Sequence, residues 1–120
     1  MTFVRTVLVV DDEPSLRALV RTILEREGHR VLEAASAAEL FECLDVERPD
    51  VILLDVHLGP EDGLAIGAGL RAEKRNRDVE IIFMTGTLDA PEVIRQSKLF
   101  KARILRKPFD LEELTTAVAA

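Results

Sequence analysis

The sequence contains a single cysteine, no tryptophan and no tyrosine among its 120 residues. One thiol, that of Cys43, excludes an intrachain disulfide and fits a reducing cytosol. The apolar run over residues 6–10 is too short for a signal peptide or a membrane span, and acidic residues follow it. We therefore expect a soluble, cytoplasmic protein that has no membrane partner.

Positive charge is also scarce, because 16 Lys and Arg stand against 22 Asp and Glu, which gives a formal net charge of −6. This balance argues against direct nucleic-acid binding, and no aromatic-plus-basic motif or recognition helix is visible. A glycine-rich phosphate loop, zinc-ligand spacing and a local Ser-His-Asp arrangement are absent as well. Apolar residues make up 48% of the chain, which favours one globular domain over residues 1–120.

Short apolar runs alternate with longer runs of helical periodicity, which is typical of a parallel α/β sheet. We expect strands over residues 5–10, 30–34, 51–54, 80–85 and 103–106. The first helix is expected to begin at Pro14 and to stop at Gly28. The second should run from the Ser36–Glu39 capping box to the break at residues 48–50, and the third over residues 64–75. The fourth should run from the Asp89–Glu92 capping box to about residue 98, and the fifth from Asp110 onwards.

Two of these helices carry informative patterns. The apolar positions 16, 19, 20, 23 and 24 of the first helix form one stripe that should be buried, whereas Arg17, Arg21 and Glu25 should point outward. Gly67 and Gly69 in the interior of the third helix make that helix intrinsically weak.

Side chains of complementary chemistry follow four of the expected strands. Asp11 and Asp12 follow the first strand, Asp55 the third, Thr85 ends the fourth, and Lys107 follows the fifth. The carboxyl ends of parallel strands share one edge of a sheet, where ligands bind. We expect these side chains to meet in one small site, and an acid-rich pocket with one lysine suits a divalent cation and a phosphoryl group.

Each of these residues also has a plainer interpretation when it is taken alone. Asp11 or Asp12 could cap the next helix, because Asp is a favoured N-cap residue. Asp55 and Thr85 could be ordinary residues at strand ends, and Lys107 could be a solvated lysine. The functional interpretation depends on all of them lying at the same edge of the sheet.

Together with the Asp62-Gly63 turn and Pro108-Phe109, these residues make the chain resemble the receiver domain of bacterial two-component response regulators over essentially its whole length. The resemblance implies an α/β fold of the flavodoxin-like, doubly wound (βα)5 type. Such a fold is a three-layer sandwich around a parallel sheet of strand order 2-1-3-4-5.

The resemblance also implies a function. Asp55 would accept a phosphoryl group from a sensor histidine kinase or a phosphotransfer protein in a Mg²⁺-dependent reaction, and the domain would change conformation to control an output. Thr85 and Lys107 would contact oxygens of the phosphoryl group. The peptide bond between Lys107 and Pro108 would be cis.

The metal site that the resemblance implies is built from oxygen ligands. Asp12 and Asp55 would bind Mg²⁺ directly, and Asp11 would act at least partly through water. The backbone carbonyl of His57 would be a further ligand, whereas its imidazole is not required and is taken as a loop side chain.

Three positions depart from the family pattern. Ile104 stands where the family often has Tyr or Phe, Leu99-Phe100 replaces an alanine-glycine pair at the end of the fourth helix, and Gly59 precedes Pro60 where proline is usual. The first two departures affect the face through which many relatives dimerise. A homodimer formed on phosphorylation is therefore left open.

The leading interpretation is a phosphoacceptor switch, which is a signalling module and not a turnover enzyme. The alternative is a pseudo-receiver that acts as a phosphorylation-independent interaction domain, and the complete set of acids, Thr85 and Lys107 argues against it. A third hypothesis is a small hydrolase, for which no second general acid–base is visible near Asp55. The fifth helix reaches residue 120 without a stop signal. Whether the output is a further domain or a separate downstream protein is therefore left open.

Overall fold

The computed structural model describes residues 4–86 and 90–119, and its centre is a parallel sheet of five strands. The strands of this sheet are β1 (Thr6–Val10), β2 (Arg30–Ala34), β3 (Val51–Asp55), β6 (Glu80–Thr85) and β7 (Arg103–Arg106). Their order across the sheet is β2-β1-β3-β6-β7, and every neighbouring pair is parallel. This confirms the predicted order 2-1-3-4-5.

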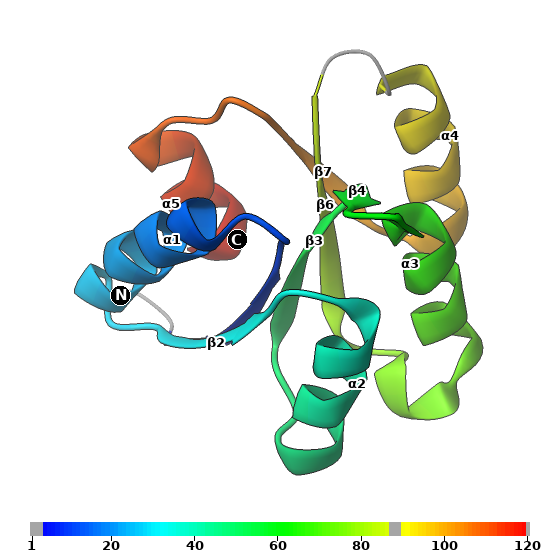
Figure 1. Cartoon of the computed structure of the whole chain (residues 1–120), viewed down its shortest axis with the longest axis horizontal. Helices are drawn as coiled ribbons and strands as arrows, with labels where there is room; N and C mark the ends of the chain where they lie inside the picture. Colours follow the sequence, from blue (N-terminus) through cyan, green and yellow to red (C-terminus); the bar gives the residue numbers. More distant parts are fainter. Residues whose placement is uncertain (1–3, 87–89, 120) are drawn as a thin grey trace.

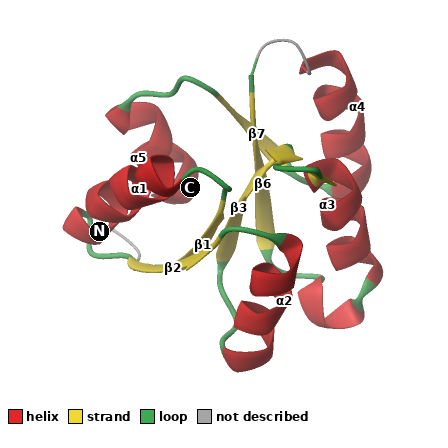
Figure 2. Ribbon diagram, in the orientation of Figure 1, coloured by secondary structure: helices red, strands yellow, loops and turns green. Residues whose placement is uncertain are grey.

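Helices cover both faces of the sheet and complete a three-layer sandwich (Figure 1). They are α1 (Pro14–Arg26), α2 (Ala37–Val46), α3 (Gly63–Ala72), the 3-10 helix η1 (Lys74–Asn76), α4 (Ala90–Phe100) and α5 (Leu111–Ala119). Figure 2 shows α1 and α5 on one face of the sheet and α2, α3 and α4 on the other. None of the helices in the described ranges is long and apolar enough to span a membrane.

The central strands are apolar because both of their faces are covered. Alternate residues of each strand enter two separate core clusters, one on each side of the sheet. In β3, for example, Ile52 and Leu54 pack in the cluster beneath α2, α3 and α4, whereas Val51 and Leu53 pack in the cluster beneath α1 and α5. All four side chains are fully buried.

A short antiparallel hairpin, formed by β4 (His57–Leu58) and β5 (Glu61–Asp62), lies between β3 and α3 and was not predicted. Its turn contains Gly59, whose φ of +59° is a conformation that favours glycine. Asp62 caps α3, because its carboxylate accepts a hydrogen bond of 2.9 Å from the backbone N–H of Leu64. A Cβ atom on Gly63 would lie 2.0 Å from the carbonyl oxygen of Asp55, so α3 can start this close to β3 only with glycine.

Several local expectations are met and others are not. Ser36 caps α2 by accepting a hydrogen bond from the N–H of Glu39, but the Glu39 carboxylate binds the N–H of Ala35, one residue earlier than in a standard capping box. Leu19, expected within the buried stripe of α1, is 54% exposed. The predicted Asp89 cap of α4 lies outside the described residues.

Helix α4 ends on an unusual residue. Lys101 has a φ of +54°, and it is the one residue other than glycine with a positive φ among those described. The N–H of Ala102 binds the carbonyl of Ser97 at 2.8 Å, which is the bond of a Schellman C-cap. The left-handed conformation thus falls on a lysine, at the position directly after Leu99-Phe100.

The two interior glycines of α3 have different surroundings. A Cβ atom on Gly67 would lie 2.6 Å from the Cζ atom of Phe83, a ring that is fully buried in β6. A Cβ atom on Gly69 would meet nothing within 4 Å. Gly67 therefore allows α3 to approach the sheet, whereas Gly69 weakens the helix without a packing reason.

We expect Gly69→Ala to raise the free energy of unfolding by about 0.5–1 kcal/mol, because alanine loses less backbone entropy in a helix. Gly67→Ala should lower it by about 1–2 kcal/mol, because the new methyl group overpacks against the Phe83 ring. Urea denaturation of both variants measures the difference. A stabilising Gly67→Ala variant would show that α3 moves easily away from Phe83.

Candidate functional site

The five side chains predicted at the strand ends all lie at the carboxyl edge of the sheet. Asp55 and Thr85 end β3 and β6, Asp11 and Asp12 directly follow β1, and Lys107 directly follows β7. The exposed fraction is 1% for Asp11, 6% for Asp55 and 1% for Thr85, whereas Asp12 is exposed. Two buried carboxylates in one place require a compensating positive charge.

Lys107 supplies this charge. Its ammonium nitrogen lies 2.8 Å from Oδ2 of Asp11 and 3.2 Å from Oδ2 of Asp55, so one cation joins both buried carboxylates. The three residues come from three different strand ends, and the convergence predicted from the sequence is therefore present.

The second oxygen of each buried carboxylate is fixed by the chain that follows it. Oδ1 of Asp11 accepts a hydrogen bond of 2.9 Å from the N–H of Glu13, and Oδ1 of Asp55 accepts one of 3.1 Å from the N–H of His57. Both are local bonds to the residue two positions later, a pattern that Asp commonly makes. Each carboxylate is thus held at both oxygens before any ligand binds.

The electrostatics of the site follow from burial and from these contacts. Burial raises the pKa of Asp55, the nearby charge of Lys107 opposes this effect, and the charge of Asp11 adds to it, so that the pKa lies above its usual value. Burial alone would lower the pKa of Lys107, but its hydrogen bond to Asp11 and the charges of both carboxylates outweigh burial and raise it. Lys107 therefore stays protonated at neutral pH.

The acids could also hold a metal ion. One carboxylate oxygen from each of Asp11, Asp12 and Asp55 lies within 4.8 Å of the others. Ligands on opposite sides of an octahedral Mg²⁺ lie about 4.2 Å apart at the usual metal–oxygen distance. Since neighbouring ligands lie only about 3 Å apart, the three oxygens must move inward to bind one ion, and an all-oxygen set is the kind that Mg²⁺ prefers.

The ends of β6 and β7 are tied together beside the acids. The backbone N–H of Lys107 donates to the carbonyl of Thr85 at 2.7 Å, and the Thr85 hydroxyl donates to the carbonyl of Gly86 at 3.0 Å. The Lys107-Pro108 peptide bond is cis, as the resemblance implies.

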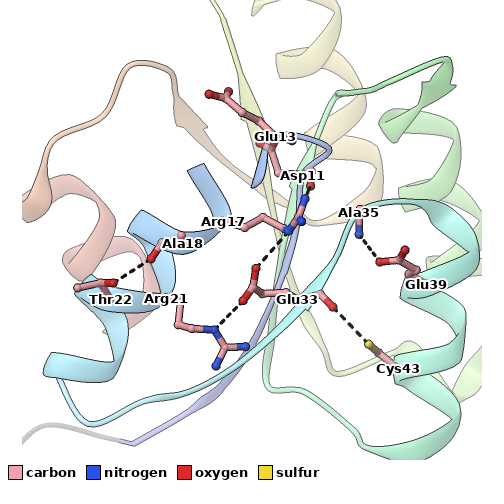
Figure 3. A network of polar contacts seen from close by, with 10 residues as sticks. All are labelled: Asp11, Glu13, Arg17, Ala18, Arg21, Thr22, Glu33, Ala35, Glu39 and Cys43. Atoms are coloured by element: carbon pink, nitrogen blue, oxygen red, sulfur yellow. Dashed lines mark hydrogen bonds and ion pairs between the residues drawn. The ribbon is translucent and has the colours of Figure 1, made fainter. Parts of the chain in front are cut away.

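Sequence reasoning missed a polar network behind Asp11 (Figure 3). Arg17 was expected to point outward, but its Nη1 donates to the backbone carbonyl of Asp11 at 2.6 Å and its Nε to Glu33 at 3.2 Å. Arg21, also expected to point outward, lies 2.6 Å from the other oxygen of Glu33. Burial would raise the pKa of Glu33, but the two guanidinium groups outweigh it and lower the pKa.

The face that departs from the family pattern is packed with apolar side chains. Ile104 and Phe100 are both partly buried against the core cluster beneath α2, α3 and α4. Phe100 belongs to α4 and Ile104 to β7, which contact each other. This arrangement agrees with a packing role for Phe100.

Comparisons with known proteins agree with the geometry. The family described as response regulator receiver domain matches residues 7–119. Sporulation initiation phosphotransferase F of Bacillus subtilis is 33% identical over 113 residues, which cover 93% of this chain and 89% of that protein. Transcriptional regulatory protein GltR of Pseudomonas aeruginosa is 31% identical over 97% of this chain, which spans only 48% of GltR. The chemotaxis response regulator CheY4 of Vibrio cholerae superposes with a TM-score of 0.86 at 30% identity over 97% of each chain.

We expect Lys107→Met to lower the free energy of unfolding by about 2 kcal/mol, because it leaves two buried carboxylates without a compensating positive charge. Adding Asp55→Asn to this variant should recover part of the loss, because one of the two charges is removed. Urea denaturation of the wild type, both single variants and the double variant gives the coupling energy. Simple additivity of the two changes would contradict the bridge, and Lys98→Met, at an exposed site, controls for the loss of a lysine.

Proposed function

Because the chain belongs to the response regulator receiver domain family, we propose that Asp55 is its phosphoacceptor. The observation that carries this proposal is the single ammonium of Lys107 in contact with both Asp11 and Asp55 at the carboxyl edge of the sheet. A receiver domain acts in phosphorelay signalling, and its family is not a classical enzyme family. The site is thus expected to be modified once and reset, with no cycle of substrate turnover.

The proposed reaction transfers a phosphoryl group from a phosphohistidine. A carboxylate oxygen of Asp55 attacks phosphorus, the new P–O bond forms, and the P–N bond to the imidazole breaks. The leaving imidazole nitrogen regains a proton from solvent. The product is an aspartyl phosphate on this chain and an unmodified histidine on the donor.

The residues around Asp55 have separate roles in this proposal. Lys107 moves from pairing with the carboxylates to pairing with a phosphoryl oxygen, where its charge offsets the charge on the transferred group. The Thr85 hydroxyl donates to another phosphoryl oxygen, which requires its present bond to Gly86 to be exchanged. The N–H of His57 orients the carboxylate of Asp55 for attack.

The proposed metal ligands are Asp11, Asp12, Asp55 and the backbone carbonyl of His57. Bound Mg²⁺ would supply neutralisation of the negative charges that meet when a carboxylate approaches a phosphoryl group. The fit rests on the three carboxylate oxygens described above.

The proposed partners follow from the same family. We infer a sensor histidine kinase or a phosphotransfer protein as donor, since the name of the Bacillus subtilis relative describes a phosphotransferase. The phosphorylated form would act on an output domain or a separate downstream protein. A cytoplasmic location and a homodimer formed on phosphorylation stay predictions.

Millimolar Mg²⁺ should raise the melting temperature, because an ion that binds only the folded state stabilises it by about 1.4 kcal/mol at ten times its dissociation constant. Asp12→Ala should remove this shift, since the variant lacks one of the three carboxylates. Asp45→Ala, an exposed acid on α2 away from this edge, should keep it. Thermal scans with and without Mg²⁺ test the metal site, and an equal shift in wild type and Asp12→Ala contradicts it.

Incubation with a small acyl phosphate and Mg²⁺ should add one phosphoryl group per chain, visible as a mass increase that hydroxylamine reverses. Asp55→Asn should abolish the increase, and Lys107→Ala should slow it while Mg²⁺ still binds. Asp45→Asn serves as the matched control. A phosphorylated Asp55→Asn protein would identify another acceptor, no uptake by the wild type would favour the pseudo-receiver, and steady release of phosphate would favour the hydrolase.

A further inference from the structure

A second charged concavity lies at the opposite edge of the sheet from the acidic site. It is a groove of about 890 Å³ lined by residues that directly precede four of the parallel strands. Val4 and Arg5 precede β1, Pro49 and Asp50 precede β3, Asp78 and Val79 precede β6, and Lys101 lies two residues before β7. The groove therefore lies at the amino edge of the sheet, where the phosphorylation chemistry has no role for it.

The groove is basic although the chain is acidic. It is lined by six cations, which are Arg5, Arg48, Arg71, Arg75, Arg77 and Lys101. Three acids, Asp50, Asp78 and Glu80, also line it, and two of the six cations are paired with acids: Arg5 with Glu80 at 3.0 Å and Arg75 with Glu73 at 2.8 Å. Asp50 accepts the N–H of Thr6 at 2.8 Å, and Glu80 pairs with Arg5 and Arg103 at 3.0 Å each.

Arg71 builds the inner wall of the groove. Its guanidinium donates to the backbone carbonyls of Phe100 at 2.7 Å, Asn76 at 2.8 Å and Val79 at 2.7 Å. These acceptors are neutral, and no carboxylate of the described residues forms an ion pair with Arg71. The side chain thus ties the end of α4, η1 and the start of β6 together, and the acid that acts on its charge is Asp78, which also lines the groove.

Arg48 is held in the same way. Its Nη2 donates to the side-chain oxygen of Asn76 at 2.8 Å and to the carbonyl of Arg75, both neutral acceptors. Asn76 is 1% exposed, and its amide nitrogen has no hydrogen-bond partner within the described part of the chain. Asn76 is not among the residues that line the groove, so this side chain supports Arg48 from behind the groove wall.

Two further cations at the rim are free to bind. Arg77 and Lys101 are exposed and make no hydrogen bond or ion pair through their side chains with any described residue. Lys101 also has the left-handed backbone conformation in which glycine is favoured. This conformation belongs to the C-cap of α4 and places the lysine at the rim.

We propose that this basic groove binds a compact anion that carries two or more phosphate groups. The guanidinium groups of Arg48 and Arg77 offer paired N–H donors that match phosphate oxygens, and Lys101 adds a mobile point charge. The volume is that of a small-molecule site. The cations surround one concave volume from five separate segments, which favours a compact polyanion over an extended acidic peptide.

The test is a titration of the ¹⁵N-labelled chain with sodium pyrophosphate in the absence of Mg²⁺, followed by amide chemical shifts. We expect saturable shifts in residues 48–50, 75–80 and 101–103, with the acidic edge unchanged. Arg77→Gln and Lys101→Gln should each weaken binding roughly tenfold, the effect of losing one charge-assisted hydrogen bond. Both side chains are exposed, so the variants should fold.

The controls are Lys74→Gln and Lys98→Gln, which remove the same charge from exposed positions on η1 and α4 that do not line the groove. Equal weakening by the controls would overturn the proposal, because it would indicate general attraction to positive charge. Shifts that never saturate, or that centre on the acidic edge, would also overturn it. Tighter binding of a poly-glutamate peptide than of pyrophosphate at the same ionic strength would overturn the choice of a phosphate ligand.

Discussion

The contact of the partly buried Lys107 ammonium with two buried carboxylates is the interaction on which the carboxyl edge of this fold depends. Asp11 follows β1 and Asp55 ends the neighbouring β3, and their charges repel strongly where water is excluded. β7, which leads to the lysine, is not a neighbour of β3, since β6 lies between them. The four-carbon stem of Lys107 therefore crosses the end of β6 to reach both acids, which a shorter side chain could not do.

The site could be predicted from the sequence because the carboxyl ends of parallel strands lie side by side at one edge of the sheet. β2, β6 and β7 occupy the predicted residues, since each is an apolar run bounded by charged or turn residues. The hairpin of β4 and β5 was missed because strands of two residues have no periodicity. Arg17 was misplaced for a different reason: its contact with Glu33 depends on where β2 lies beside α1, which helical periodicity does not encode.

The basic groove is a second feature that could not be predicted from the sequence alone. Three of its six cations lie in the basic stretch of residues 71–77, but the other three come from the start of β1, the loop before β3 and the residue after α4. The net charge of −6 even points the other way. Likewise, the packing role of Gly67 is visible only once the position of the Phe83 ring is known. From the sequence alone, Gly67 could be assigned only the loss of helix stability that glycine causes.

An excess of acids at one edge of the sheet and an excess of cations at the other give the molecule a permanent electric dipole along its strands. A charged partner that approaches within a Debye length, about 8–10 Å at physiological salt, would exert a torque on it before any contact forms. A basic surface would turn the carboxyl edge towards itself, and an acidic surface would turn it away. The degree to which the two molecules are aligned when they meet, and with it the rate of productive collision, should therefore fall as salt is added. This holds even when the groups that finally touch are neutral.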